Sequence, residues 1–227
     1  KKLPTEAISG MPFPSTKAER FGLIQEELAH EPFKLIVAVI FLNQTTGKAA
    51  IPMFRKFIDT YPTIDDIANA SVDEIATLIE PLGLQNNRAK ILINLARTWL
   101  SKPPTKGKRY KTPQYPTKTD SNGIKLSEVL ADDDERIGAF EVGHLPGCGP
   151  YALDSWRIFC RDKCRDLAAG WNGEGAAEGF QPEWMRVRPT DKELRAYLRW
   201  MWLKEGFIWD WRTGETEVAS KEELEKA

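Results

Sequence analysis

Hydrophobic residues recur at helical spacing along most of the chain. The strongest pattern is the apolar run from Phe33 to Asn43, whose length favours a buried helix over a strand. Ser71, followed three residues later by Glu74, forms a capping-box sequence that marks a helix start. The expected helices span residues 21–30, 33–43, 49–60, 63–70, 71–79, 88–100 and 126–142. A last long helix begins near Val187, with Thr190 or Asp191 as its N-cap, so the chain is predicted to be all-α.

Three segments depart from this pattern. Residues 101–123 are basic and rich in proline, which predicts a surface loop or a disordered insert. Its lysines could contact phosphates, but most charge runs are only solvated, so both interpretations stay open. Residues 165–185 are rich in glycine and alanine without a helical or strand period and predict a loop. The polar tail after Gly214 is expected to fray.

A glycine-containing turn lies between two predicted helices. It reads Leu145-Pro146-Gly147-Cys148-Gly149-Pro150-Tyr151, and its two glycines permit backbone angles that other residues resist. Exposed N–H groups of such a turn and the dipole of the following helix favour a phosphate. The alternative is an ordinary helix–helix turn.

Composition narrows the classes of function. The chain has 227 residues, 41% of them hydrophobic and 29% charged, which is typical of a soluble globular protein. A net charge of −1 gives no global signal for nucleic acid, so any such signal must be local. Three cysteines cannot supply a four-thiolate iron–sulfur site, and two histidines make structural zinc improbable. No run approaches the ~18 apolar residues of a membrane span. The first residue is Lys1 rather than Met, which is compatible with a segment of a longer protein.

Several motifs in order resemble the helix–hairpin–helix DNA glycosylases of the endonuclease III superfamily. The resemblance runs from about Phe21 to Trp202, interrupted by the two inserts, and is strongest to the thymine-DNA glycosylases that in animals carry a methyl-CpG-binding domain. The motifs that carry it are Leu145–Gly149, Phe41–Pro52, Pro81–Leu84 with Arg88-Ala89-Lys90, Asp154–Cys160 and Pro189–Leu194.

The resemblance implies a helix–hairpin–helix fold of two helical lobes with the active site in the cleft between them. One lobe covers about residues 33–160 and includes the basic insert. The other covers residues 1–32 and 165–227, so that the whole chain forms one catalytic domain.

The resemblance also implies roles for four residues around the reacting base. Asp191 falls at the family's catalytic Asp, and a carboxylate can stabilise the positive charge that develops on the sugar. Tyr151 stands where bifunctional relatives carry a lysine, and because Schiff-base chemistry needs an amine, no strand cleavage is expected. Gln25 matches the pocket glutamine that reads the base, and Ile24 is expected beside it. Asp154 is a rival carboxylate, expected to support the hairpin or pocket.

A second set of residues is expected to grip the DNA. Leu84 matches the wedge pushed into the base stack, and Gln44 the residue that fills the space of the flipped nucleotide. The thymine-glycosylase branch carries Arg at the Gln44 position, and this departure leaves the tightness of DNA binding and the opposite-base preference open, but not the reaction. The other expected DNA contacts are Lys48, Leu145, Gly147, Cys148 and Gly149.

These implications predict a monofunctional glycosylase that removes thymine, uracil or related 5-substituted uracils opposite guanine. The expected partner is double-stranded DNA with a mismatched or deaminated base, and the protein is expected to be a nuclear monomer without a membrane partner. No cofactor or iron–sulfur cluster is expected, although the hairpin carbonyls would allow a monovalent cation. The alternatives are a non-catalytic helix–hairpin–helix DNA-binding module and a helical protein-interaction domain.

Overall fold

The computed structural model describes residues 9–226 and is mostly helical, as predicted. The helices are α1 (Ile24–Leu28), α2 (Pro32–Leu42), α3 (Gly47–Thr60), α4 (Ile64–Asn69), α5 (Val72–Ile79), α6 (Gln85–Ser101), α7 (Pro150–Phe159), α8 (Arg161–Cys164), α9 (Lys192–Lys204) and α10 (Lys221–Lys226). Single 3-10 turns span Glu80–Leu82 (η1) and Glu183–Arg186 (η2). The strands are β1 (Arg109–Lys111), β2 (Val129–Leu130), β3 (Ala139–Phe140), β4 (Phe207–Trp209) and β5 (Thr216–Val218).

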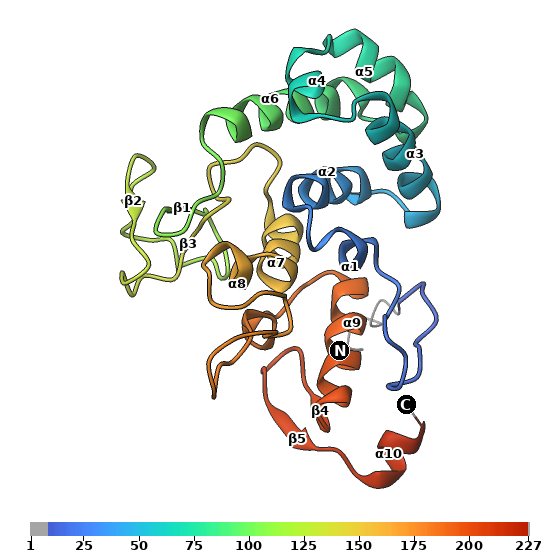
Figure 1. Ribbon diagram of the computed structural model, residues 1–227, viewed down its shortest axis with the longest axis vertical. Coiled ribbons are helices and arrows are strands. Elements are labelled where there is room, and N and C mark those ends of the chain that lie inside the picture. The colour runs from blue at the N-terminus through green and yellow to red at the C-terminus, as the bar shows by residue number, and fades with distance from the viewer. Residues whose placement is uncertain (1–8, 227) are drawn as a thin grey trace, which may run out of the picture.

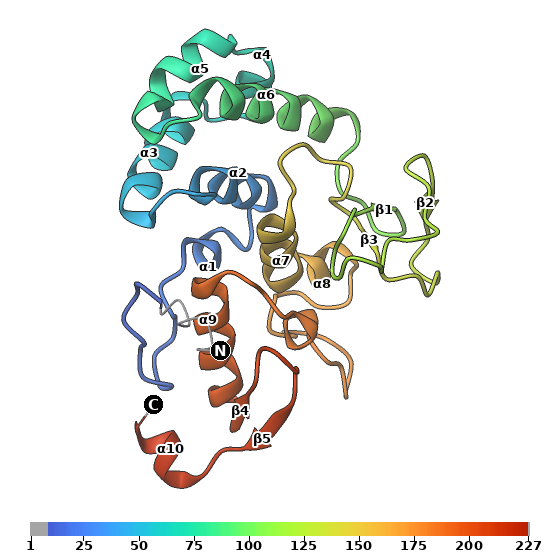
Figure 2. The same ribbon diagram turned by 180° about the vertical axis from the view of Figure 1, so that it is seen from behind.

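The helix α2 lies at the centre of the molecule. Helices α3 to α6 pack at one end, and α9, β4, β5 and α10 lie at the other (Figure 1). Figure 2 shows α7 beside α2 in the middle, with the β1–β3 sheet projecting to one side. Leu35, Ile36, Val37 and Phe41 of α2 are fully buried, which explains why this helix has a continuous apolar run rather than a one-sided pattern.

An aromatic cluster fixes α9 against the middle of the molecule. The ring of Tyr197 on α9 lies 5.1 Å from Phe159 of α7 and 5.8 Å from Phe21, which precedes α1. Trp200 packs on the same Phe21 ring. Three segments distant in sequence therefore meet here, and their packing sets the position of the first residue before α9, Asp191.

The helix predicted over residues 126–142 is wrong. This segment forms β2 and β3, which pair with β1 in an antiparallel sheet of order β2-β1-β3. The buried guanidinium of Arg109 donates to the main-chain carbonyls of Ala131, Asp134 and Arg136, which turns those carbonyls away from helical bonding. Gly138 approaches the backbone at Asp120 so closely that a Cβ would lie 2.4 Å from it.

The inserts and the tail contribute more structure than expected. The 101–123 segment is neither disordered nor only a surface loop, because β1 lies in it and Tyr115 is 4% exposed within the core. The 165–185 segment is a loop up to η2, as predicted, but its Trp184 is fully buried. The tail after Gly214 forms β5, which pairs with β4, and α10, because β4 offers an open edge.

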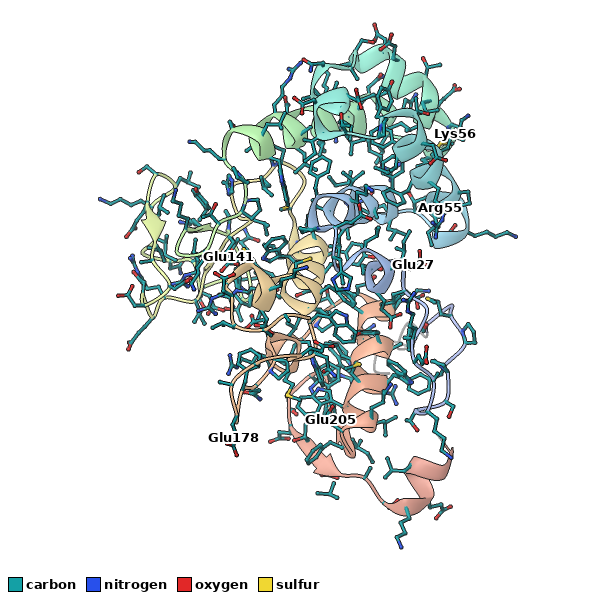
Figure 3. The ribbon with its side chains drawn as sticks, viewed as in Figure 1. Glu27, Arg55, Lys56, Glu141, Glu178 and Glu205 are labelled. Carbon is teal, nitrogen blue, oxygen red and sulfur yellow. The ribbon has the colours of Figure 1, made fainter. Side chains whose placement is uncertain are left out.

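A buried polar network joins both inserts to α7. Arg157 donates to Glu183 at 2.6 Å, and Arg161 donates to the same oxygen at 2.7 Å. Arg161 and Trp156 also bond Glu141, which is labelled in Figure 3. Since a buried charge is stable only when it is paired, these bonds hold Glu183 of η2 and Glu141, just after β3, against α7.

Asp154 of α7 belongs to the same network. Its Oδ1 accepts a hydrogen bond of 2.7 Å from the hydroxyl of Tyr115, and Arg157 donates to that hydroxyl at 3.2 Å. Burial raises the pKa of Asp154 to about 6, while Tyr115 and Arg157 act in the opposite direction.

The hairpin is preceded by turns rather than by the expected helix. Hydrogen bonds from Gly143 to Phe140 and from Leu145 to Val142 wind residues 140–145 into successive turns. Gly147 has a φ of +83°, and Gly149, with a φ of −80°, is the N-cap of α7. The hairpin therefore leads directly into the helix that carries Tyr151.

Gly147 and Gly149 differ in what the fold demands of them. A Cβ on Gly147 would lie 2.8 Å from Ile91 and 2.9 Å from Ile40, and its φ is left-handed, whereas a Cβ on Gly149 would meet open space. Gly147→Ala is therefore expected to lower the free energy of unfolding by about 2 kcal/mol, and Gly149→Ala by less than about 1 kcal/mol. Urea denaturation of both variants measures this difference, and equal losses would contradict it.

Asp154 gives the stability a defined pH dependence. Because its pKa is raised in the folded protein, the folded state binds more protons than the unfolded chain between pH ~4 and 6, so this group's contribution to the free energy of unfolding falls as pH rises through that window. Asp154→Asn keeps an acceptor for Tyr115 but cannot ionise. The unfolding free energy of the wild type minus that of the variant should fall by roughly 2 kcal/mol from pH 4 to 7. A constant difference in denaturation experiments across this range would refute it.

Candidate functional site

Gln25 and Tyr151 meet between α1 and α7. The amide Nε2 of Gln25 donates to the Tyr151 hydroxyl at 2.9 Å, and Gln25 is 1% exposed. The carboxylate of Glu26 fixes α1 by accepting from the backbone N–H groups of Phe21, Gly22 and Leu23. The exposed ion pair of Glu27 with Arg55, labelled on α1 and α3 in Figure 3, is a further contact of 2.8 Å. The short helix therefore holds Gln25 in one orientation.

Asp191 is the N-cap of α9, which decides between the two caps expected from the sequence. Its Oδ1 accepts hydrogen bonds of 2.9 Å from the backbone N–H groups of both Glu193 and Leu194. Within residues 9–226, Oδ2 has no hydrogen-bonding partner. The cap thus uses one oxygen of the carboxylate, and the other is available to a ligand.

Asp191 lies close to α7, because its neighbour Thr190 lines the same cavity as Pro150 and Asp154 of α7. Burial raises the pKa of Tyr151, and the negative charge of Asp191 raises it further. Asp191 also adds to the raised pKa of Asp154. Tyr151 is consequently a neutral phenol at physiological pH. The structure joins Gln25 and Tyr151 by a hydrogen bond and places Asp191 in the same region of the molecule. Asp154 lies behind them, 5% exposed and bonded to Tyr115, which fits its expected supporting place.

Ile24 and the hairpin residues differ in accessibility. Ile24 and Leu145 are each 4% exposed and belong to the core. Cys148 is half-buried and Gly149 exposed. The hairpin can accordingly be contacted through its main chain, and Leu145 anchors it from below.

Gln44 and Leu84 lie in two loops that one arginine connects. Both residues have left-handed backbone angles, φ 58° and 50°, and both side chains are exposed, Leu84 by 60%. Arg88 donates to the carbonyl of Leu82 in one loop and to that of Asn43 in the other. Lys48, in the first turn of α3, is exposed near Gln44 in sequence.

A basic cavity lies next to α7, and the sequence did not predict it. Its volume is about 810 Å³, and Pro150 and Thr190, the neighbours of Tyr151 and Asp191, lie in its wall. Arginines from four distant segments line it: Arg109, Arg157, Arg161, Arg186, Arg188 and Arg212. They are scattered in sequence, so no charge run predicts the cavity, and the only available signal was the surplus of Arg over residues 157–188.

Neither a metal-type cluster nor a membrane-spanning helix occurs in the part of the chain that the structure describes. Residues 9–226 contain no group of three or more His, Cys, Asp or Glu side chains arranged to hold a metal ion. No helix in this range is long and apolar enough to cross a membrane.

Comparisons with known proteins bear on this arrangement. A family described as the HhH-GPD superfamily base excision DNA repair protein matches residues 37–202, which exclude Gln25. The chain is 38% identical over 68 residues to a thymine/uracil-DNA glycosylase of Pyrobaculum aerophilum and 37% over 67 residues to a thymine-DNA glycosylase of Aeropyrum pernix, covering 30% of this chain and 30% of each relative. It is 25% identical over 183 residues, 81% of this chain, to a methyl-CpG-binding domain protein 4-like protein of Arabidopsis thaliana.

These matches span less than a third of each relative's length, 28% for the Arabidopsis protein. They nevertheless confirm the expected relation to the thymine-glycosylase and methyl-CpG-binding-domain branch. Because the family match includes the hairpin, α7 and the start of α9, the chain belongs to the HhH-GPD superfamily of base excision DNA repair proteins.

Proposed function

We propose that this protein is a monofunctional DNA glycosylase. It flips thymine, uracil or a related 5-substituted uracil out of a mispair with guanine and hydrolyses the bond between base and sugar, acting as a monomer on nuclear double-stranded DNA. The observation that carries the proposal is the hydrogen bond between Gln25 and Tyr151 close to the N-cap of α9, where Oδ2 of Asp191 is open to a ligand.

The chemistry follows from the open carboxylate oxygen. As the N-glycosidic bond breaks, positive charge develops on the sugar, and the fixed negative charge of Asp191 stabilises it. Water adds to C1′ of the sugar and gives up a proton, while the departing base carries away the bonding electron pair and takes up a proton. The two backbone N–H groups that hold Oδ1 fix the carboxylate before substrate binds, so no side-chain ordering is needed during the reaction.

Gln25 has the groups needed to hold the flipped base. One N–H bonds Tyr151, which leaves its second N–H and its Oε1 for the substrate. This donor and acceptor complement a ring carbonyl and the N3–H of thymine or uracil. The names of the two glycosylase relatives support the choice of these bases.

The remaining predicted residues serve duplex binding in this proposal. The hairpin grips the backbone through main-chain N–H groups, with room for a monovalent cation on its carbonyls, and such contacts position without reading sequence. Leu84 enters the base stack and Gln44 fills the space of the flipped nucleotide, which offsets part of the cost of flipping. The basic cavity beside Pro150 and Thr190 adds attraction for phosphates.

Asp191→Asn separates catalysis from helix capping, because Asn is an equally good N-cap but carries no charge. We expect the variant to keep its unfolding free energy within about 1 kcal/mol while its single-turnover excision from G·T or G·U duplexes falls at least ~100-fold. Alkali cleavage of the abasic product measures excision, and A·T duplexes serve as the substrate control. Tight binding to mispaired duplexes without product, in the wild type, would instead support the non-catalytic DNA-binding module.

Tyr151 predicts that the strand stays intact. Because a phenol forms no Schiff base, strand cleavage should appear only after alkali, and borohydride should trap no protein–DNA adduct. Tyr151→Phe is the matched control, since it removes the hydroxyl bonded to Gln25 without adding an amine. Nicked strands or a trapped adduct with the wild type would show that another amine in the chain performs lyase chemistry.

A further inference from the structure

We propose that Arg88 is a positioning residue that joins the Gln44 and Leu84 loops into a single DNA-engaging unit. The inference rests on the proposed function and adds a coupling between two of its residues. The Gln44 loop connects α2 to α3, and the Leu84 loop connects η1 to α6. Arg88 is in the first turn of α6.

The guanidinium of Arg88 contacts both loops with short hydrogen bonds. Nη1 donates to the carbonyls of Leu82 at 2.8 Å and Gly83 at 2.7 Å, directly before Leu84. Nη2 donates at 2.7 Å to the carbonyl of Asn43 and at 2.7 Å to Oγ1 of Thr45, the two neighbours of Gln44. One planar, rigid group thus fixes the residues on either side of Gln44 and the two residues before Leu84.

In the described part of the chain, Arg88 donates all of its guanidinium hydrogen bonds to neutral acceptors. Its side chain is buried, with the residue 5% exposed, and within residues 9–226 no carboxylate forms an ion pair with it. Burial lowers its pKa, but three carbonyl oxygens and a hydroxyl face the positive charge. A buried cation of this kind is retained only where it makes charge-assisted bonds, and here all of those bonds go to the two loops.

Both loops contain a residue in an unfavourable backbone conformation. Gln44 and Leu84 have left-handed backbone angles, which a non-glycine residue adopts at a cost of about 1–3 kcal/mol. The Leu84 side chain is 60% exposed, so its own packing contributes little to that conformation. The bonds from Arg88 therefore supply the interactions that keep both side chains directed outward.

Coupling the loops has a consequence for base flipping. In the proposed complex, Leu84 and Gln44 act on neighbouring positions of one duplex. A fixed spacing between these two residues therefore lowers the entropy lost when both bind the DNA. When that spacing is free, each residue must be ordered separately and each contributes less. Arg88 therefore makes the contributions of Gln44 and Leu84 interdependent.

A double-mutant design measures this interdependence. In the full-length wild type, Leu84→Ala and Gln44→Ala are each expected to slow single-turnover excision from a G·T duplex about 10-fold, and in an Arg88→Met background less than about 3-fold. If Arg88 only supports folding, each substitution will cost the same factor in both backgrounds, which would overturn the proposal. Thr45→Val, which removes one of the four acceptors, is the matched mild control.

Amide hydrogen exchange of the free protein tests the clamp without DNA. The N–H groups of Thr45 and Gly83 are hydrogen-bonded to Leu42 and Glu80, one in each loop. In Arg88→Met both should exchange about 10-fold faster or more, whereas exchange in α9 stays unchanged. Faster exchange in one loop alone, or in neither, would refute the clamp.

The two readouts keep the two proposals apart. If the wild type excises no base, the proposed glycosylase function fails, and hydrogen exchange alone still decides whether Arg88 clamps the loops. Should Arg88→Met fail to fold, Arg88→Lys replaces it under the same criteria, because lysine keeps the charge but cannot span four acceptors in two loops.

Discussion

Burial of α7 is the constraint on which the rest of the structure depends. Its residues from Ala152 to Phe159 are all buried, and they include two ionisable residues, Asp154 and Arg157. Charged groups in that position require partners, and both inserts supply them, Tyr115 from one and Glu183 from the other. The segments that interrupt the helical pattern thus complete the helix on which the proposed site is built, and the hairpin before α7 and Tyr151 in its first turn are positioned together.

The buried arginines of this protein have two different structural roles. Arg157 and Arg161 pair with carboxylates, which fixes the core around α7. Arg88 has main-chain carbonyls and a hydroxyl in place of a carboxylate, and its bonds end in two exposed loops. The first arrangement stabilises a fold, whereas the second determines the relative placement of surface residues. Because the loops carry strained backbone at Gln44 and Leu84, the second is where structure and the proposed recognition of DNA are most directly linked.

The sequence predicts those features that depend on local pattern. Helical periodicity located α2, α6 and α9, and ordered motifs indicated the family and the neighbourhood of Gln25, Tyr151 and Asp191. It failed over residues 126–142, where the strand pairing of β2 and β3 with β1 and the carbonyl bonds of Arg109 override local propensity. The roles of Arg88 and Tyr115 depend on contacts between residues 39 to 45 positions apart, which no periodicity records. The individual site roles remain predictions.

We propose that this site releases a pyrimidine base by hydrolysis and leaves the strand whole. Mass spectrometry of a single-turnover reaction with a G·U or G·T duplex tests it most directly, because it weighs both products at once. We expect free uracil or thymine in amounts equal to an unbroken strand that carries one abasic sugar. Recovery of only the intact duplex, or of cleaved strand ends without alkali, would contradict it.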